Sequence, residues 1–98
     1  MVVYLSGKMT GEPDLGRALF NKVQKKLEAE GITVINPAML PEGLKPEAYL
    51  PICLEMLKWA NVIVMLPGWT ESAGARLERA FAKYQGIKVR YLTKEGRE

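Results

Sequence analysis

The sequence predicts a three-layer α/β protein, in which a parallel sheet of about four strands carries helices on both faces. The first observation behind this prediction is that short β-rich runs alternate with helical segments along the chain. Such an order implies parallel strands joined by right-handed crossovers. The second is that the third β-rich run is apolar throughout, as in a central strand covered on both faces. The 98 residues leave room for one domain, 1–98, and for no second core.

The first strand and the first helix have recognisable boundaries. Residues 2–5 form a β-rich run that stops at a glycine turn, and the glycines and proline of 7–13 predict a loop. A helix is predicted over 14–30, with Asp14 as its N-cap and Gly31 beyond its end. Its apolar residues recur at helical spacing and should be buried: Leu15, Leu19, Phe20, Val23 and Leu27. The residues expected to face water are Arg17, Lys22, Lys25, Lys26 and Glu30.

The middle of the chain repeats this order of strand, loop and helix. Residues 32–35 predict the second strand, and three prolines make 36–46 the longest loop. A helix is expected over 47–59, where Pro51 must sit in the first turn or kink the helix. The apolar run 61–66 predicts the third strand.

The C-terminal part predicts one further helix and one further strand. Residues 73–85 form the helix, which Gly86 ends, and 87–92 form the fourth strand. The charged tail 93–98 is expected to be frayed. The apolar face of the helix is expected to contain Ala73, Leu77, Ala80, Phe81 and Tyr84. The complete β-α-β-α-β-α-β order is typical of Rossmann-like and flavodoxin-like folds.

The composition excludes several kinds of chemistry. The sequence contains no histidine and a single cysteine, Cys53. Catalysis by histidine, an internal disulfide and a histidine or cysteine metal site are therefore ruled out, and no metal or cofactor is expected. The net charge of +3 suits an anionic small ligand better than nucleic acid. Basic helix residues could form a nucleic-acid surface, but such faces are usually only solvated. They are Lys22, Lys25, Lys26, Arg76, Arg79 and Lys83.

Two further patterns concern location in the cell. No apolar run reaches the length of a membrane span. The first residues also lack the basic segment of a signal peptide. We therefore expect a cytoplasmic protein.

The loops after the first and third strands could hold a small anion, because ligands of open parallel sheets bind beyond the carboxyl ends of the strands. The first loop contains Ser6, Gly7, Lys8, Met9, Thr10 and Gly11. These residues could offer backbone N–H groups, a charge and a hydroxyl to an oxyanion. A plain glycine-rich turn explains them equally well. In the other loop, Ser72 is a natural N-cap, and the small residues after it could admit a phosphate to the helix N-terminus.

Glu78 lies at an unusual place in the predicted third helix. Its neighbours one turn away are Gly74, Ala75, Phe81 and Ala82, none of them basic, although the same helix carries several basic residues. A partly buried carboxylate near a helix N-terminus is a candidate nucleophile or base. The alternative is a solvated glutamate at the edge of the apolar face.

Four segments together resemble a known family. They are residues 3–11 (VYLSGKMTG), Asn36-Pro37-Ala38, residues 66–69 (LPGW) and residues 72–78 (SAGARLE). In these segments the chain resembles the DUF4406 family, which is common in bacteria and their phages. That family is similar to the superfamily of nucleoside 2-deoxyribosyltransferases and deoxyribonucleoside 5′-monophosphate N-glycosidases. The resemblance covers nearly the whole chain.

The resemblance implies a set of site residues. In the related enzymes a Ser-x-Gly-x-x-x-Glu segment binds the 5′ phosphate or hydroxyl with its serine and attacks the anomeric carbon with its glutamate. Here these residues are Ser72 and Glu78. Such a carboxylate can trap an oxocarbenium-like state covalently, as in retaining glycosidases. The residues expected to bind the substrate are Tyr4, Gly7, Lys8, Met9, Thr10, Gly11, Asn36, Trp69, Ser72 and Gly74.

Two other expectations concern aromatic residues and assembly. Trp69 could stack on a base, form a subunit contact or simply pack, whereas Trp59 is expected in the core. The related enzymes are usually dimers or larger, with neighbouring subunits completing the site. The resemblance therefore implies a homodimer.

The chain departs from the related enzymes at two positions. An acidic residue on their helix before the third strand aligns with Cys53, and an aspartate just before that strand aligns with Asn61. Cysteine is a poor substitute for a carboxylic acid at neutral pH, and a small buried apolar residue is the favoured interpretation. Other acids could reach the site, and the sequence does not select among them: Glu12, Asp14, Glu55 and Glu71.

Two functions therefore remain open. The first is an N-glycosidase or deoxyribosyltransferase for a deoxynucleoside or its 5′-monophosphate, with Glu78 as the nucleophile. The second is a nucleotide-binding protein without catalysis, a sensor or a sequestering module, which the cysteine at position 53 favours. In both cases the partner is a small nucleoside or nucleotide.

Overall fold

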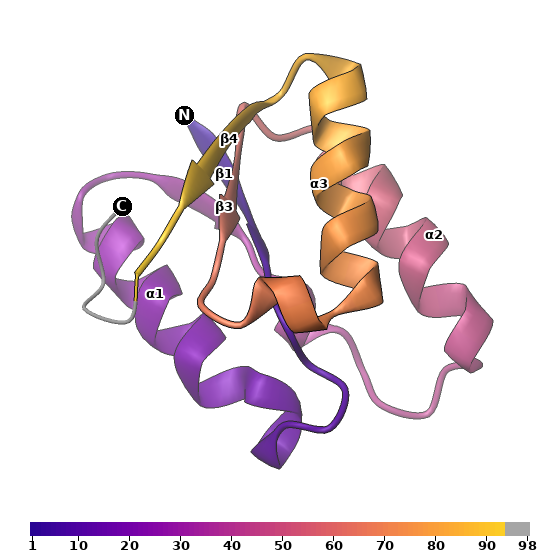
Figure 1. The fold of residues 1–98 in the computed structure, drawn as a ribbon. Helices are drawn as coiled ribbons and strands as arrows, with labels where there is room; N and C mark the ends of the chain where they lie inside the picture. Colours follow the sequence, from indigo (N-terminus) through magenta and orange to yellow (C-terminus); the bar gives the residue numbers. More distant parts are fainter. Residues whose placement is uncertain (94–98) are drawn as a thin grey trace.

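The structure, a computed structural model, describes residues 1–93 and has the predicted alternation of strands and helices (Figure 1). Its strands are parallel and ordered β2-β1-β3-β4: β1 (Val2–Ser6), β2 (Thr33–Ile35), β3 (Val62–Met65) and β4 (Lys88–Tyr91). The α-helices are α1 (Arg17–Ala29), α2 (Pro46–Leu57) and α3 (Ala73–Gln85). No helix of the described residues has the length and apolar character that crossing a bilayer requires. The tail expected to be frayed, 93–98, lies outside the described residues except for Thr93.

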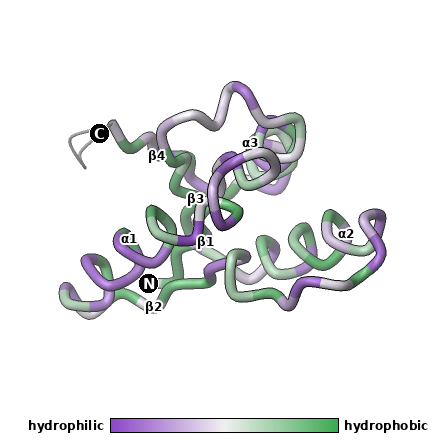
Figure 2. Tube along the Cα trace, turned by 90° about the horizontal axis from the view of Figure 1, so that it is seen from below, coloured by the Kyte–Doolittle hydropathy of each residue, from purple (hydrophilic) through white to green (hydrophobic). Residues whose placement is uncertain are grey.

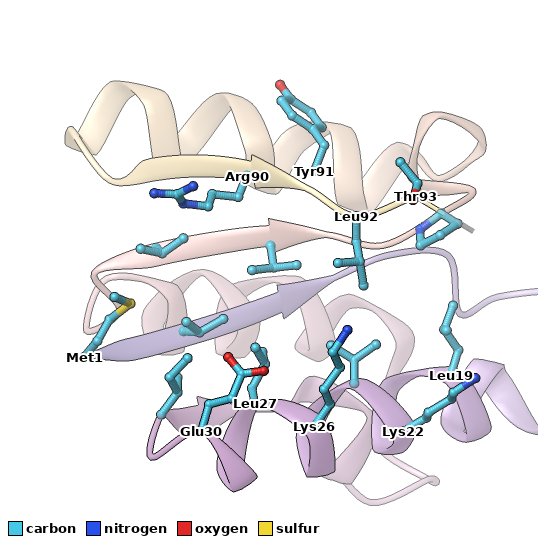
Figure 3. Close-up of a pocket in the computed structure, with 16 residues that line it drawn as sticks. Met1, Leu19, Lys22, Lys26, Leu27, Glu30, Arg90, Tyr91, Leu92 and Thr93 are labelled. Carbon is cyan, nitrogen blue, oxygen red and sulfur yellow. The ribbon is translucent and has the colours of Figure 1, made fainter. Parts of the chain in front are cut away.

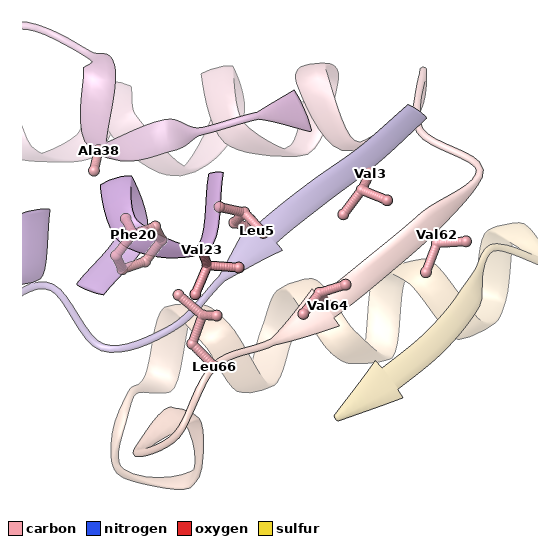
Figure 4. Close-up of a cluster of buried hydrophobic side chains, with 8 residues drawn as sticks. All are labelled: Val3, Leu5, Phe20, Val23, Ala38, Val62, Val64 and Leu66. Atoms are coloured by element: carbon pink, nitrogen blue, oxygen red, sulfur yellow. The ribbon is translucent and has the colours of Figure 1, made fainter. Parts of the chain in front are cut away.

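The helices cover both faces of the sheet. Figure 2 shows α1 on one side and both α2 and α3 on the other. Side chains alternate along β1: Val3 and Leu5 belong to the core under α1 (Figure 4), and Tyr4 belongs to the core under α2 and α3. Each residue of β3 is buried, as expected for a central strand. The carboxyl ends of β1 and β3 lie side by side, with Ser6 paired to Met65.

The helix α1 begins at Arg17 rather than at Asp14, because the chain makes a left-handed turn first. The segment Pro13–Gly16 is a short 3-10 helix in which Asp14 has a φ of 49°, and Gly16, with a φ of 74°, is the N-cap of α1. A Cβ at Gly16 would lie 2.9 Å from the carbonyl oxygen of Lys8. Glycine therefore lets this turn pack against the first loop, and that contact sets the start of the helix.

The faces of α1 match the prediction in part. Phe20 and Val23 are buried, whereas Leu19 is 38% exposed. Arg17, expected to face water, is half-buried: its Nε donates a 3.1 Å hydrogen bond to the carbonyl oxygen of Ala38. The loop after β2 passes over this end of α1 and covers the guanidinium.

In the helix α2, Pro51 lies beyond the first turn, so of the two expected placements of this proline the one in the first turn is wrong. The buried residues of α2 are Cys53 and Leu57. The expectation that Trp59 packs in the core is wrong, since this residue is 73% exposed. The helix has ended before Trp59, and the buried positions on either side of it belong to Leu57 and Ala60.

The helix α3 has the predicted bounds but presents a different face to the sheet. Ser72 caps it, with its Oγ accepting a 3.1 Å hydrogen bond from the N–H of Ala75. The buried residues are Ala75, Glu78 and Ala82. Most of the face expected to be buried is exposed: Ala73, Leu77, Ala80 and Tyr84. Small residues let α3 approach the sheet closely, and the carboxylate of Glu78 finds polar partners there.

Candidate active site

Glu78 is the centre of a buried polar cluster. The residue is 7% exposed, on the side of α3 that faces the sheet. The Tyr4 hydroxyl donates a 2.7 Å hydrogen bond to its Oε2, and the Ser6 hydroxyl donates a 2.6 Å hydrogen bond to its Oε1. These two bonds do not use all of the lone pairs of the carboxylate, which can accept further hydrogen bonds. The alternative of a solvated glutamate does not hold.

The strand β1 supplies both hydroxyl groups. Tyr4 and Ser6 are two positions apart, so their side chains point to the same face of the sheet. Both are buried, and β1 is held between β2 and β3. Ser6 was expected only as the first residue of the anion-binding loop and not as a partner of Glu78; its spacing from Tyr4 is the signal that could have indicated this role.

Burial controls the protonation of this cluster. Desolvation raises the pKa of the Glu78 carboxyl, and the hydrogen bonds from Ser6 and Tyr4 offset part of that rise. Desolvation and then the charge of Glu78 raise the pKa of the Tyr4 hydroxyl. Tyr4 therefore stays protonated, as a hydrogen-bond donor, over the range in which Glu78 ionises.

Cys53 approaches the same cluster from α2. It is buried, and its thiol interacts with both the Tyr4 hydroxyl and the Glu78 carboxyl. Desolvation raises the pKa of the thiol, so Cys53 stays protonated at neutral pH. The residue is a small buried side chain, as interpreted from the sequence, and also a direct neighbour of Glu78.

A cavity of about 300 Å³ has Glu78 in its wall and lies at the carboxyl ends of the strands. Several expected site residues line it, from the first loop and from the start of α3: Gly7, Met9, Thr10, Ser72, Gly74 and Glu78. The remaining wall contains residues that the sequence did not indicate, among them Pro46, Tyr49 and Leu50 of α2. Tyr49 and Leu50 lie one turn before Cys53, which relates them to the site once α2 is known to cover it.

Lys8 and Gly11, in the first loop, are not part of the wall of this cavity. The Nζ of Lys8 lies 3.2 Å from the Oε1 of Glu71, so the lysine ties the first loop to the loop after β3. Gly11 has a φ of 86°, which makes it a turn residue.

Asn36 and Trp69 also lie away from the cavity wall. The Asn36 amide donates hydrogen bonds to Asn21 and Gln24 of α1, which fastens the loop after β2. The ring of Trp69 lies 5.7 Å from that of Tyr91. Trp69 therefore packs against Tyr91 in this structure, and its stacking on a base or contact with a second subunit stays a prediction.

The position aligned with an aspartate, Asn61, lies at the other end of the sheet. Its side-chain oxygen accepts a 2.7 Å hydrogen bond from the N–H of Val2, at the amino ends of β1 and β3. The other candidate acids are not in the wall of the cavity with Glu78: Glu12, Asp14, Glu55 and Glu71. Within residues 1–93, no three cysteine or acidic side chains lie close enough together to hold a metal ion.

A second cavity, of about 430 Å³, adjoins the first. The two share a wall that includes Met9, Tyr49 and Cys53. The far wall of the second cavity carries the charged residues Arg17 and Glu42, with 3.6 Å between Nη1 and Oε2.

A third cavity, of about 510 Å³, lies on the α1 side of the sheet (Figure 3). Val3 and Val64 are among its apolar lining residues. Lys26 of α1 extends toward Leu92, whereas Lys22 extends toward Leu19 (Figure 3). None of the expected site residues lines this cavity.

Two solved enzyme structures share the fold. The 2-desoxiribosyltransferase from Leishmania mexicana matches with a TM-score of 0.76 at 17% identity, over 93% of this chain and 63% of that enzyme. The CMP N-glycosidase BcmB from Clostridium botulinum matches with a TM-score of 0.71 at 21% identity, over 94% of this chain and 71% of that enzyme. This chain thus spans less than two thirds of the Leishmania enzyme. At these identities the likeness shows the predicted α/β fold. No curated protein matches the sequence.

The family resemblance rests on the sequence itself. The family described as "Domain of unknown function (DUF4406)" matches residues 1–91. The match includes the first loop, the start of α3 and Glu78. The expected resemblance is confirmed, and the chain belongs to the DUF4406 family.

Proposed function

We propose that this chain breaks the N-glycosidic bond of a deoxynucleoside or its 5′-monophosphate, with Glu78 as the nucleophile. The observation that carries the proposal is the Glu78 carboxylate, which lies in the wall of an open cavity with one hydroxyl bonded to each oxygen. The names of the two enzymes that share the fold, a deoxyribosyltransferase and a CMP N-glycosidase, support this class of reaction.

The cavity suggests how such a substrate would lie. The sugar would sit over Glu78, and the 5′ phosphate would approach the start of α3. The first N–H groups of a helix lack partners within it and favour an anion, and Gly74 leaves space there. Ser72 caps the same turn and lines the cavity. The base would extend past Cys53 into the second cavity.

The reaction begins with the ionised form of Glu78. One carboxylate oxygen bonds to C1′ while the bond from C1′ to the base breaks, and the electron pair of that bond leaves with the base. The hydrogen bonds from Tyr4 and Ser6 fix the plane of the carboxylate for this attack. Water then displaces Glu78 from C1′ in hydrolysis, whereas a second base does so in transfer.

The direct test is the release of free base from the natural deoxynucleoside monophosphates, followed by chromatography. Wild type should release base from at least one of them, and the Glu78→Gln variant should release almost none. Glu28→Gln is the matched control, because Glu28 is exposed on α1 and outside the cavity wall. Equal release by wild type and Glu78→Gln would contradict the proposal.

The second candidate is a nucleotide-binding protein without turnover. The observation that favours it is the thiol of Cys53 beside Glu78, where the related enzymes carry an acid that could protonate a departing base. Calorimetry with the same monophosphates separates the two candidates. Binding without any release of base would support the second, and no binding would contradict both.

Assembly as a homodimer also stays a prediction. Leu77 and Tyr84 leave apolar surface exposed on α3, the helix that carries Glu78. Sedimentation of the purified protein would measure its mass in solution, and a monomer at all concentrations would contradict this expectation.

A further inference from the structure

We propose that Arg17 stabilises the departing base as an anion, and that this chain thereby catalyses base departure without a carboxylic acid at position 53. The role rests on the proposed function and adds a catalytic residue to it. It answers a chemical difficulty, since departure of a base normally needs its developing negative charge to be neutralised.

Arg17 lies where the base of the bound nucleotide would be. It lines the second cavity, which shares Cys53 with the cavity that contains Glu78. Cys53 and Glu78 line the same cavity. A sugar over Glu78 therefore directs its base past Cys53 toward Arg17. Among the described residues that line either cavity, Arg17 is the one basic side chain.

The guanidinium of Arg17 is held in place by protein groups. Its Nε donates to the carbonyl oxygen of Ala38 at 3.1 Å, and its Nη1 donates to Asp14 at 2.9 Å and lies 3.6 Å from Glu42. Within residues 1–93, these contacts are made by Nε and Nη1 of Arg17 and not by its other terminal nitrogen, Nη2. The side chain is 22% exposed. A fixed, permanently charged donor of this kind can bond a ring nitrogen or carbonyl oxygen without reorganising.

The step is balanced without a proton from the protein. The bond from C1′ to the base nitrogen breaks, and its electron pair spreads over the ring to an acceptor atom that faces Arg17. The base anion is stabilised by a hydrogen bond that the guanidinium donates, and the guanidinium keeps its own protons. Water protonates the base after it has left. The neutral Cys53 thiol takes no part in this step.

Two pairs of substrates with poor and good leaving groups test the role. The pairs are deoxyguanosine monophosphate with its N7-methyl derivative, and deoxyuridine monophosphate with its 5-nitro derivative. N7-methylguanine leaves as a neutral base, and 5-nitrouracil leaves as an anion that its own nitro group stabilises, so neither needs stabilisation by Arg17. Arg17→Ala should lower kcat about 100-fold for the unmodified member of a pair, the effect of losing one donor to a developing anion. It should change kcat little for the modified member.

Two further variants complete the test. Lys22→Ala, at an exposed position of the same helix, should leave both rates unchanged. Arg17→Lys keeps a positive charge and should recover part of the kcat lost on the unmodified substrates. If Arg17→Ala does not fold, Arg17→Lys tests the role of Arg17 in its place. Equal losses on both members of a pair would overturn the role of Arg17 while leaving the proposed function intact. No turnover of any of these substrates by wild type would overturn the proposed function as well.

Discussion

The hydroxyl of Tyr4 and the carboxylate of Glu78 are joined by a 2.7 Å buried hydrogen bond across 74 positions of sequence. The bond links β1 to α3, and Ser6 makes a parallel bond to the other carboxylate oxygen. These contacts stabilise a charged group in a place where desolvation opposes its charge. The same geometry that lets the fold tolerate Glu78 also directs the carboxylate toward the cavity.

The first prediction concerns Tyr4→Phe, which removes the donor and keeps the ring. We expect kcat/KM to fall about 10- to 100-fold, the value of one hydrogen bond to a charged group. The acidic limb of the pH–rate profile should move to higher pH, because losing a donor to the ionised form raises the pKa of Glu78 further. Tyr84→Phe, an exposed tyrosine on α3, is the control. An unchanged profile would show that Tyr4 only fills space.

The second prediction concerns stability and pH in Glu78→Gln. Because burial raises the pKa of Glu78, the folded protein binds this proton more tightly than the unfolded chain. The stability from the protonated group is complete below the ordinary carboxyl pKa and is lost as pH rises through the folded pKa. Glutamine does not ionise, so the stability of the variant relative to wild type should increase from acidic to alkaline pH. Urea unfolding at acidic and alkaline pH measures the free energy of unfolding of both proteins. A difference between variant and wild type that does not grow with pH would contradict the prediction.

The third prediction concerns the reactivity of Cys53. Its thiol is buried and its pKa is raised, so a chromogenic disulfide reagent should label the folded protein far more slowly than the urea-unfolded chain. Because Cys53 lines both cavities of the site, a bound deoxynucleoside monophosphate should slow labelling further. Fast labelling that the nucleotide does not slow would show that the nucleotide binds outside the cavities that Cys53 lines.

The fourth prediction compares two glycines of the site. A Cβ at Gly7 would lie 3.0 Å from the Cβ of Leu66, so Gly7→Ala should destabilise the fold by about 1–3 kcal/mol through overpacking. A Cβ at Gly74 would meet only the Ser72 Oγ, at 3.9 Å. Gly74→Ala should therefore stabilise α3 slightly while weakening nucleotide binding, since Gly74 lines the cavity. Thermal unfolding and calorimetry separate the two effects, and equal melting temperatures for both variants would contradict the packing argument.

The helix α3 shows where sequence patterns succeed and where they stop. Ser72 and Gly86 mark its ends, and the structure places the helix between them. The buried face is different, because hydrophobic periodicity assumes that a helix buries its most apolar side. Here Leu77 and Tyr84 face outward. The sheet side instead carries small residues and Glu78, at a distance from which the hydroxyls of β1 reach the carboxylate.

Loop residues of the site could be predicted where strand topology places them. Gly7 and Ser72 follow strands whose carboxyl ends meet in a parallel sheet, and both line the cavity. Whether Tyr49 lines the cavity depends on how α2 packs over the sheet, and no local sequence pattern predicts that packing. The start of α1 was misplaced for a similar reason: Asp14 has the right chemistry for a cap, but the contact of Gly16 with the first loop decides where the helix begins.

The nucleophilic role of Glu78 is tested most directly by trapping the glycosyl–enzyme ester. A 2-fluoro arabinosyl nucleoside monophosphate should release its base once and leave the sugar on the protein, because the fluorine slows hydrolysis of the ester more than its formation. Intact-mass spectrometry and peptide mapping should find one sugar phosphate per chain, attached to Glu78 and missing in Glu78→Gln. Release of base by wild type with no adduct at Glu78, and undiminished release by Glu78→Gln, would contradict the account.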